Sequence, residues 1–195
     1  MKKLTHDEIS EKRYTLDNLH TTPKMPVYVL LNSIRSNYNV GSIFRTSDGA
    51  MIEKLYLCGY TPHPPLPGKE GKDTGKKEVL KTALGSTESV SWEYVKDPAE
   101  VINDLKKQGV KICALELTSK SKVYHEVKSS DFPLCIIVGN EITGVAQELI
   151  DLCDFSIEIP QYGIKQSLNV AVAYGIAVFE MRRIFDRTRN QKDFK

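Results

Sequence analysis

The sequence has 195 residues, enough for one domain with a hydrophobic core and a small extension. Its composition is ordinary for a globular protein, and a net charge of +2 is too small to indicate nucleic-acid binding by itself. No apolar run reaches the roughly 18 residues of a membrane span, and the polar N-terminus, MKKLTHDE, lacks the apolar segment of a signal peptide. We therefore expect neither a membrane span nor a signal peptide.

The four cysteines, Cys58, Cys113, Cys135 and Cys153, form no CxxC pair. Three of them lie in or beside apolar runs, which favours buried free thiols over disulfides or a zinc site. We therefore expect a cytoplasmic protein without a bound metal.

A short polar segment opens the chain. Residues 5–19 show an amphipathic pattern that predicts a helix, and Pro23 and Pro26 mark a linker after it. We divide the chain into an N-terminal helical extension, residues 1–25, and one domain, residues 26–195.

The domain alternates short apolar runs with helical patterns. We expect strands at 27–31, 54–59, 89–94, 110–117, 134–138 and 155–159. We expect helices from about residue 40 and at 78–84, 98–108, 145–153 and 168–181. Such alternation predicts an α/β fold with a mostly parallel sheet flanked by helices.

Polar loops follow three of the predicted strands, at 32–39, 139–144 and 160–167. Ligands of open α/β sheets bind beyond the carboxyl ends of strands, so these loops are expected to form one site. A fourth loop, 60–77, is rich in Pro, Gly and Lys and is predicted to be long, mobile and functional.

Two of these loops contain charged candidates. The first leads into a helix, a junction that suits anions, and Arg35 and Arg45 would reinforce this; solvated arginines are the alternative. In the second, Gly139 and Gly144 permit close backbone approach to a ligand. Glu141 either belongs to the site or only complements the helix dipole.

The third loop leads into a helix without a charge from Leu168 to Phe179. Ser167 is the predicted N-cap, with Asn169 beside it. A helix without a polar face is expected to be buried on most sides, against its own sheet or a second subunit. An ordinary core helix with a cap is the alternative.

The three loops, in this order, resemble the three motifs of the SpoU (TrmH-like) family of SPOUT RNA methyltransferases. The corresponding segments are NVGSIFRTSD at 39–48, IIVGNEITG at 136–144, and IPQYG at 159–163 followed by SLNVAVA at 167–173. The resemblance covers about residues 27–185. Each motif alone is unspecific, whereas three in order at this spacing are highly specific.

The resemblance implies a C-terminal trefoil knot, one of the exceptions to the rule against threaded chains. It implies a homodimer and S-adenosylmethionine as cofactor, and methylation of a ribose 2′-hydroxyl of tRNA or rRNA without a metal. RNA contacts would come from the N-terminal helix, the 60–77 loop and the basic segment 181–195, which has six Lys or Arg against two Asp.

The resemblance also implies the site residues. The implied catalytic residues are Arg45, Asn39, Glu141, Ser167 and Asn169. The implied cofactor-binding residues are Gly139, Asn140, Glu141, Ile159, Gln161, Gly163, Ser167, Leu168 and Asn169. The chain departs from the family at Gln161, where Met is usual, and at Ala171, where Ser is frequent; neither change removes an implied catalytic group.

The implied role of Arg45 meets a chemical objection, because a guanidinium stays protonated in proteins and is a poor base. We expect Arg45 to bind the adjacent phosphate and stabilise the developing alkoxide, with the proton leaving through that phosphate or water.

Three other functions compete with this one. A catalytically idle RNA-binding protein of the same fold need not keep Asn39, Arg45, Glu141 and Asn169. A Rossmann dehydrogenase is disfavoured because no GxGxxG occurs near the N-terminus. An enzyme that methylates a base is disfavoured by the Asn39 and Arg45 pair, which the resemblance associates with ribose.

Overall fold

The computed structural model describes residues 1–19, 21–65 and 77–192, with side chains through Arg189. The strands are β1 (Met25–Asn32), β2 (Ile52–Cys58), β3 (Trp92–Val95), β4 (Lys111–Leu115), β5 (Lys122–Val123), β6 (Leu134–Val138) and β7 (Phe155–Glu158). The helices are α1 (His6–Ser10), α2 (Leu16–Leu19), α3 (Asn37–Ala50), α4 (Lys77–Ala83), α5 (Ser86–Ser89), α6 (Pro98–Lys107), α7 (Gln147–Ile150) and α8 (Val170–Lys192), with 3₁₀ turns η1 (Tyr124–Glu126) and η2 (Ser129–Asp131).

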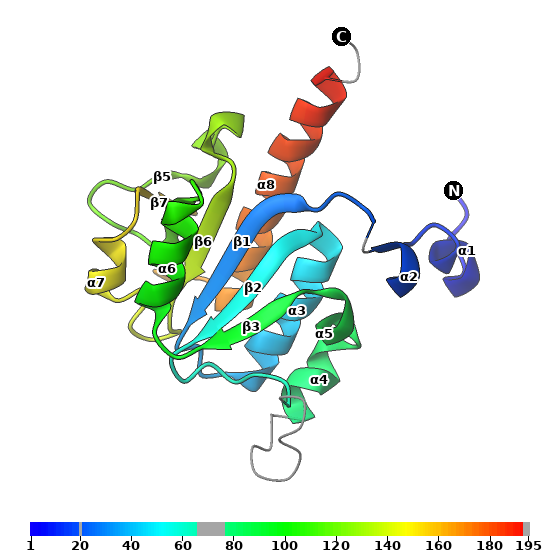
Figure 1. The fold of residues 1–195 in the computed structure, drawn as a ribbon, viewed down its shortest axis with the longest axis horizontal. Helices are drawn as coiled ribbons and strands as arrows, with labels where there is room; N and C mark the ends of the chain where they lie inside the picture. The colour runs from blue at the N-terminus through cyan, green and yellow to red at the C-terminus, as the bar shows by residue number, and fades with distance from the viewer. Residues whose placement is uncertain (20, 66–76, 193–195) are drawn as a thin grey trace.

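The strands form one sheet in the order β3-β2-β1-β6-β4-β7-β5, and every pairing is parallel. The predicted α/β class with a parallel sheet is confirmed. The carboxyl ends of β1, β6, β4 and β7 are therefore adjacent along one edge of the sheet (Figure 1). This edge is where a parallel sheet binds its ligands.

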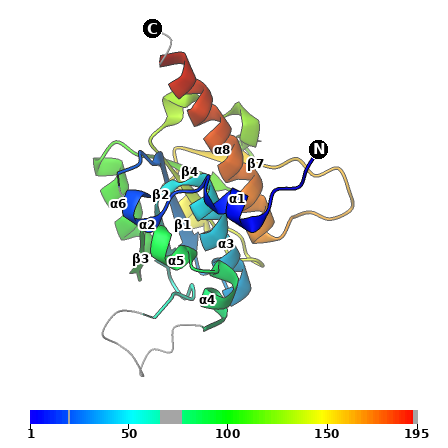
Figure 2. The ribbon, with the colours of Figure 1, turned by 90° about the vertical axis from the view of Figure 1, so that its right-hand side faces the viewer.

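Helices cover both faces of the sheet (Figures 1 and 2). One face packs against α3, α4 and α8, which bury Phe44, Val79 and Tyr174 among other side chains. The other packs against α6 and α7, which bury Ile102 and Leu149. The central strand β6 is apolar and buried at every position, as expected of a strand that is covered on both faces.

The N-terminal prediction was wrong in detail. Residues 5–19 form two short helices, α1 and α2, rather than one, and neither buries a residue. Figure 1 shows both standing to one side of the sheet. The apolar side chains of this segment, such as Ile9 and Leu16, stay exposed, so the segment lacks the packing that would extend one helix across residues 12–15. Most of the predicted 60–77 loop lies outside the described residues.

Two helices extend beyond the ends that the sequence predicted. α3 begins at Asn37, because the Ser36 hydroxyl accepts from the Asn39 amide and caps it, so Asn39 lies in the first helical turn. α8 runs on to Lys192, well beyond the predicted end at residue 181. In the region 145–153, by contrast, only Gln147–Ile150 is α-helical.

The predicted N-cap of the last helix was also wrong. Asn169, not Ser167, caps α8: its Oδ1 accepts from the amides of Ala171 at 2.9 Å and Val172 at 3.4 Å. Nor is α8 buried on most sides within one chain, because Val172 and Phe179 are about half exposed.

All four cysteines are free, and Cys58, Cys113 and Cys135 are buried. The prediction of buried thiols is confirmed for these three, while Cys153 is half-buried. Burial raises the pKa of Cys58 to about 12, so this thiol stays protonated at neutral pH.

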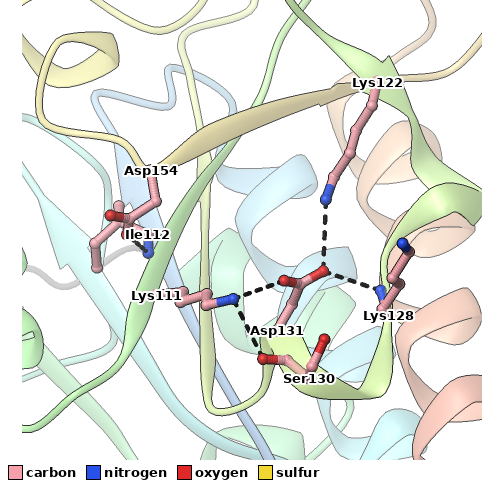
Figure 3. Close-up of polar contacts among 7 residues, drawn as sticks. All are labelled: Lys111, Ile112, Lys122, Lys128, Ser130, Asp131 and Asp154. Atoms are coloured by element: carbon pink, nitrogen blue, oxygen red, sulfur yellow. Dashed lines mark hydrogen bonds and ion pairs between the residues drawn. The ribbon is translucent and has the colours of Figure 1, made fainter.

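Ion pairs to Asp131 link β4, β5 and the turn before β6 (Figure 3). The nearly buried Asp131 carboxylate accepts from Lys111 Nζ at 2.8 Å, from Lys122 Nζ at 3.4 Å and from the Lys128 amide at 3.0 Å. Burial raises the pKa of Asp131, but the hydrogen bonds from Lys111 and Lys128 and the lysine charges outweigh it, so the net shift is downward.

Asp131→Asn is therefore expected to lower the free energy of unfolding at pH 7 by about 1–3 kcal/mol. The folded pKa lies below the unfolded value of about 3.9, so this stability is present above pH ~4 and is lost as the pH falls through the folded pKa. Urea unfolding at pH 7 and pH 3 measures it. Asp104→Asn, at an exposed pair with Lys107, is the matched control. An equal loss at both pH values would contradict the account.

Candidate active site

The carboxylate of Glu141 connects the loop after β6 to the start of α3. Its Oε2 accepts from the Arg35 amide at 2.8 Å, and its Oε1 accepts from the Ser36 amide at 3.0 Å and from Asn39 Nδ2 at 2.9 Å. Burial raises the pKa of Glu141, but these donors outweigh it and the net shift is downward. Glu141 is therefore an ionised anchor and a weak base.

Asn39 joins this anchor to the third loop. Its Oδ1 accepts from Asn169 Nδ2 at 3.1 Å, while its Nδ2 donates to Glu141. Asn169 in turn caps α8. A chain of hydrogen bonds thus runs from the β6 loop through α3 to α8, and links residues more than 100 positions apart.

Asn140, which is almost fully buried, organises the loop after β6. Its Oδ1 accepts from the amides of Ile142 and Thr143, and its Nδ2 donates to the Ser33 carbonyl and the Tyr60 hydroxyl, both at 2.8 Å. The loop closes on itself through paired backbone hydrogen bonds between Asn140 and Gly144. Its backbone is therefore fixed before any ligand arrives.

Both glycines of this loop are required, Gly139 by close contact with backbone atoms and Gly144 by its positive φ. A Cβ on Gly139 would lie 2.2 Å from the Gly144 carbonyl carbon. Gly144 has φ +68°, and a Cβ there would lie 2.2 Å from Glu116 Oε2. The loop therefore packs closely against the residue that follows β4. There is open room beyond the loop.

That room is a cavity of about 790 Å³ at the carboxyl ends of β4, β6 and β7. All nine residues that the sequence assigns to cofactor binding line it, namely Gly139, Asn140, Glu141, Ile159, Gln161, Gly163, Ser167, Leu168 and Asn169. Its outer wall is the exposed loop between β7 and α8, which projects from the body of the protein (Figure 2).

Arg45 does not line this cavity. It lies on α3 six residues after Asn39, about 9 Å further along the helix axis, and its side chain is exposed. Its guanidinium has no hydrogen bond or ion pair to any other residue in the described part of the chain. Arg45 is thus a free cation near the site rather than part of the cavity wall.

Glu116 is a site residue that the sequence reasoning missed. It follows β4, lines the cavity, and accepts from the Val145 amide at 2.9 Å. The sequence could have identified Glu116 as a polar residue at the carboxyl end of a predicted strand, because the same pattern identified the other loops.

The family model described as the SpoU rRNA methylase family matches residues 26–179. The chain belongs to this family. Among curated members, the tRNA (guanosine(18)-2′-O)-methyltransferase of Aquifex aeolicus is 34% identical over 155 residues, 80% of this chain and 68% of that protein. The 23S rRNA (guanosine-2′-O-)-methyltransferase RlmB of Neisseria meningitidis is 27% identical over 86% of this chain and 62% of its own length.

Solved structures of SpoU proteins share the fold. The A. aeolicus TrmH/SpoU tRNA modifying enzyme superposes with a TM-score of 0.72 at 30% identity, over 92% of this chain and 86% of that one. An AdoMet-bound rRNA methyltransferase from Sinorhizobium meliloti gives 0.71 at 29% identity, over 88% of this chain and 61% of that one. The chain thus spans roughly two thirds of several relatives that it matches.

Within residues 1–19, 21–65 and 77–192, no group of three or more His, Cys, Asp or Glu side chains is placed to hold a metal ion. No helix in the same part of the chain is long and apolar enough to cross a membrane.

Proposed function

We propose that this protein is an S-adenosylmethionine-dependent RNA methyltransferase that modifies a ribose 2′-hydroxyl of tRNA or rRNA. The observation that carries the proposal is the cavity that the loops after β4, β6 and β7 form at adjoining strand ends, with the Glu141–Asn39–Asn169 network at its edge. The predicted loop 32–39 lies outside the lining of this cavity and is joined to it by hydrogen bonds such as those of Asn39. Two curated relatives of this chain are named as tRNA and rRNA 2′-O-methyltransferases.

The cavity suits S-adenosylmethionine chemically. Its lining includes the carboxylates Glu116, Glu141 and Glu158 and one cation, Lys165, a balance that favours a ligand with net positive charge. Apolar side chains such as Ile157 and Leu168 also line it and can cover an adenine ring. When bound, the cofactor would supply a methyl group on a sulfonium.

The chain's own residues would position the acceptor and handle charge. Asn39 and Asn169 fix the edge of the cavity, and Glu141 holds them in place without acting as the base. The Arg45 guanidinium, which has no hydrogen-bond or ion-pair partner among the described residues, is suited to bind an RNA phosphate and stabilise an alkoxide that develops on the ribose. The proton would then leave through that phosphate or water.

Calorimetric titration of the purified protein with S-adenosylmethionine tests the cofactor half of the proposal. We expect saturable binding with one site per chain. If no binding is measured, the proposal fails and a catalytically idle RNA-binding protein of the same fold becomes the better explanation.

We also propose that the protein is a homodimer through α8. Val172 and Phe179 leave apolar surface exposed on a helix without charge from Val170 to Phe179, as expected of a self-complementary interface. Phe179→Glu is expected to convert a dimer to monomers in sedimentation-velocity measurements, whereas Glu88→Gln on α5 is expected to leave the dimer intact. A wild-type monomer at micromolar concentration would contradict the proposal.

Two further properties are part of the proposal. The trefoil knot is supported by the resemblance of the three motifs, which implies it. A cytoplasmic location is supported by the free thiols of Cys58, Cys113 and Cys135, which suit a reducing compartment.

RNA binding by the C-terminal part of α8 is expected to be electrostatic. Arg187 and Arg189 are exposed on its last turns. Replacing both with alanine is expected to weaken RNA binding and to reduce the slope of log K against log salt by about one to two. Filter binding at several salt concentrations measures this slope, and an unchanged slope would contradict a phosphate contact.

A further inference from the structure

A second, more open cavity, of about 380 Å³, shares Glu141 with the cofactor cavity. Asn39 also lines it, as do Arg35 and Ser36. Arg35 and Ser36 form the turn between β1 and α3, and Glu141 accepts from both of their amides. The backbone that lines the second cavity is therefore held by Glu141, which also lines the first.

Arg35 presents a free cation at this second cavity. Its amide is held at 2.8 Å from Glu141 Oε2, yet its side chain is exposed. No hydrogen bond or ion pair to the guanidinium occurs among the described residues. The backbone donors before α3 are already taken by Glu141, so the Arg35 guanidinium is the group suited to bind a phosphate here.

Tyr60 presents an aromatic ring next to the same turn. The residue is 65% exposed, although its hydroxyl is bound at 2.8 Å by Asn140 Nδ2, which also donates to the Ser33 carbonyl two residues before Arg35. The ring is thus anchored at one end and open to solvent. An anchored aromatic ring loses little conformational entropy when a nucleobase stacks on it.

We infer that the second cavity, together with Tyr60, receives the acceptor nucleotide of the RNA: Arg35 binds a phosphate beside it, and the base, taken out of its stack, lies against the Tyr60 ring. This inference rests on the proposed function. It assigns Arg35 and Tyr60 to RNA and leaves the cofactor cavity to the loops after β6 and β7. Single-stranded RNA is commonly recognised by such stacking.

Tyr60 is tested by two variants. Tyr60→Leu removes the ring, and its kcat/KM for RNA methylation is expected to fall roughly 5- to 100-fold, mainly through KM. Tyr60→Phe keeps the ring but loses the bond to Asn140, and it should stay within about threefold of wild type. Equal losses in both variants would show that the hydroxyl contact with Asn140 matters and not stacking, and would overturn the inference.

Arg35 is tested by the salt dependence of RNA binding. Arg35→Ala is expected to reduce the slope of log K against log salt by about one, Arg35→Lys to preserve it, and both to leave the Kd for S-adenosylmethionine unchanged. Lys107→Ala, an exposed residue on α6, is the control for a general loss of positive charge. A salt slope that is unchanged in Arg35→Ala would overturn the phosphate contact.

The experiments distinguish a failure of the proposed function from a failure of this inference. If the wild type transfers no methyl group to unmodified RNA, the proposed function fails, and the salt slope of RNA binding alone then decides whether Arg35 contacts RNA. If the wild type is active and the Tyr60 and Arg35 variants match it, the proposed function stands and this inference is wrong.

Discussion

Replacing Arg45 with alanine is expected to lower kcat for RNA methylation about 10²- to 10³-fold. The physical reason is that a preorganised cation next to a developing alkoxide acts mainly in the transition state. Because Arg45 lies outside the wall of the cofactor cavity, the Kd for S-adenosylmethionine is expected to stay unchanged. Single-turnover kinetics and calorimetry measure the two quantities.

Two further variants sharpen this test. Lys106→Ala on α6, which packs on the opposite face of the sheet from α3, should retain full activity. Arg45→Lys keeps the charge but loses the planar, bidentate geometry, so full activity in this variant would argue against a need for the guanidinium fork. A normal kcat in Arg45→Ala would exclude Arg45 from the reaction.

The second large effect is expected at the Asn39–Glu141 contact. Asn39→Asp would place a second carboxylate where Nδ2 now lies 2.9 Å from Glu141 Oε1. It would replace a hydrogen bond to a charged group with like-charge repulsion, a loss of about 2 kcal/mol or more, or roughly 30-fold in kcat/KM. The α3 dipole favours an acid at this position, but only by about 0.3–1 kcal/mol.

A double variant isolates that contact. In Asn39→Asp combined with Glu141→Gln, the new carboxylate can accept from the new amide, so this hydrogen bond returns with its polarity reversed, while the Ser36 amide loses its acceptor. We expect the double variant to be more active than Asn39→Asp alone, with a coupling energy of about 0.5–3 kcal/mol. Strictly additive losses would show that the contact does not organise the site.

The fold could be predicted because its strands are apolar runs between turn residues. The β6 run, 134–138, is buried throughout, and the loops after β1, β6 and β7 met at one edge because all strands are parallel. The convergence of Asn39, Glu141 and Asn169 was implied by the resemblance of the three motifs, not by periodicity.

Details that depend on long-range contacts could not be predicted. Ser167 and Asn169 are both good N-caps by type, and a local pattern cannot choose between them. In the structure Asn169 caps α8 while its Nδ2 donates to Asn39, a partner 130 residues away. Glu116 was missed for a similar reason, since its partner, the Val145 amide, is distant in sequence.

The exposure of one face of α8 could not be predicted from the sequence either. The absence of charge from Leu168 to Phe179 predicted burial, and Tyr174, Ala177 and Val178 are fully buried. Phe179 on the opposite side is half exposed, because one chain supplies a covering surface for only one face of the helix. The sequence pattern alone does not say whether a second subunit covers the rest.

Nucleoside analysis after methyl transfer would show whether the protein methylates ribose. Purified protein is incubated with labelled S-adenosylmethionine and unmodified total RNA, and the RNA is digested to nucleosides, with Arg45→Ala in parallel. We expect a labelled 2′-O-methylnucleoside from the wild type and almost none from the variant. A label found on a base, or equal labelling by wild type and variant, would contradict this expectation.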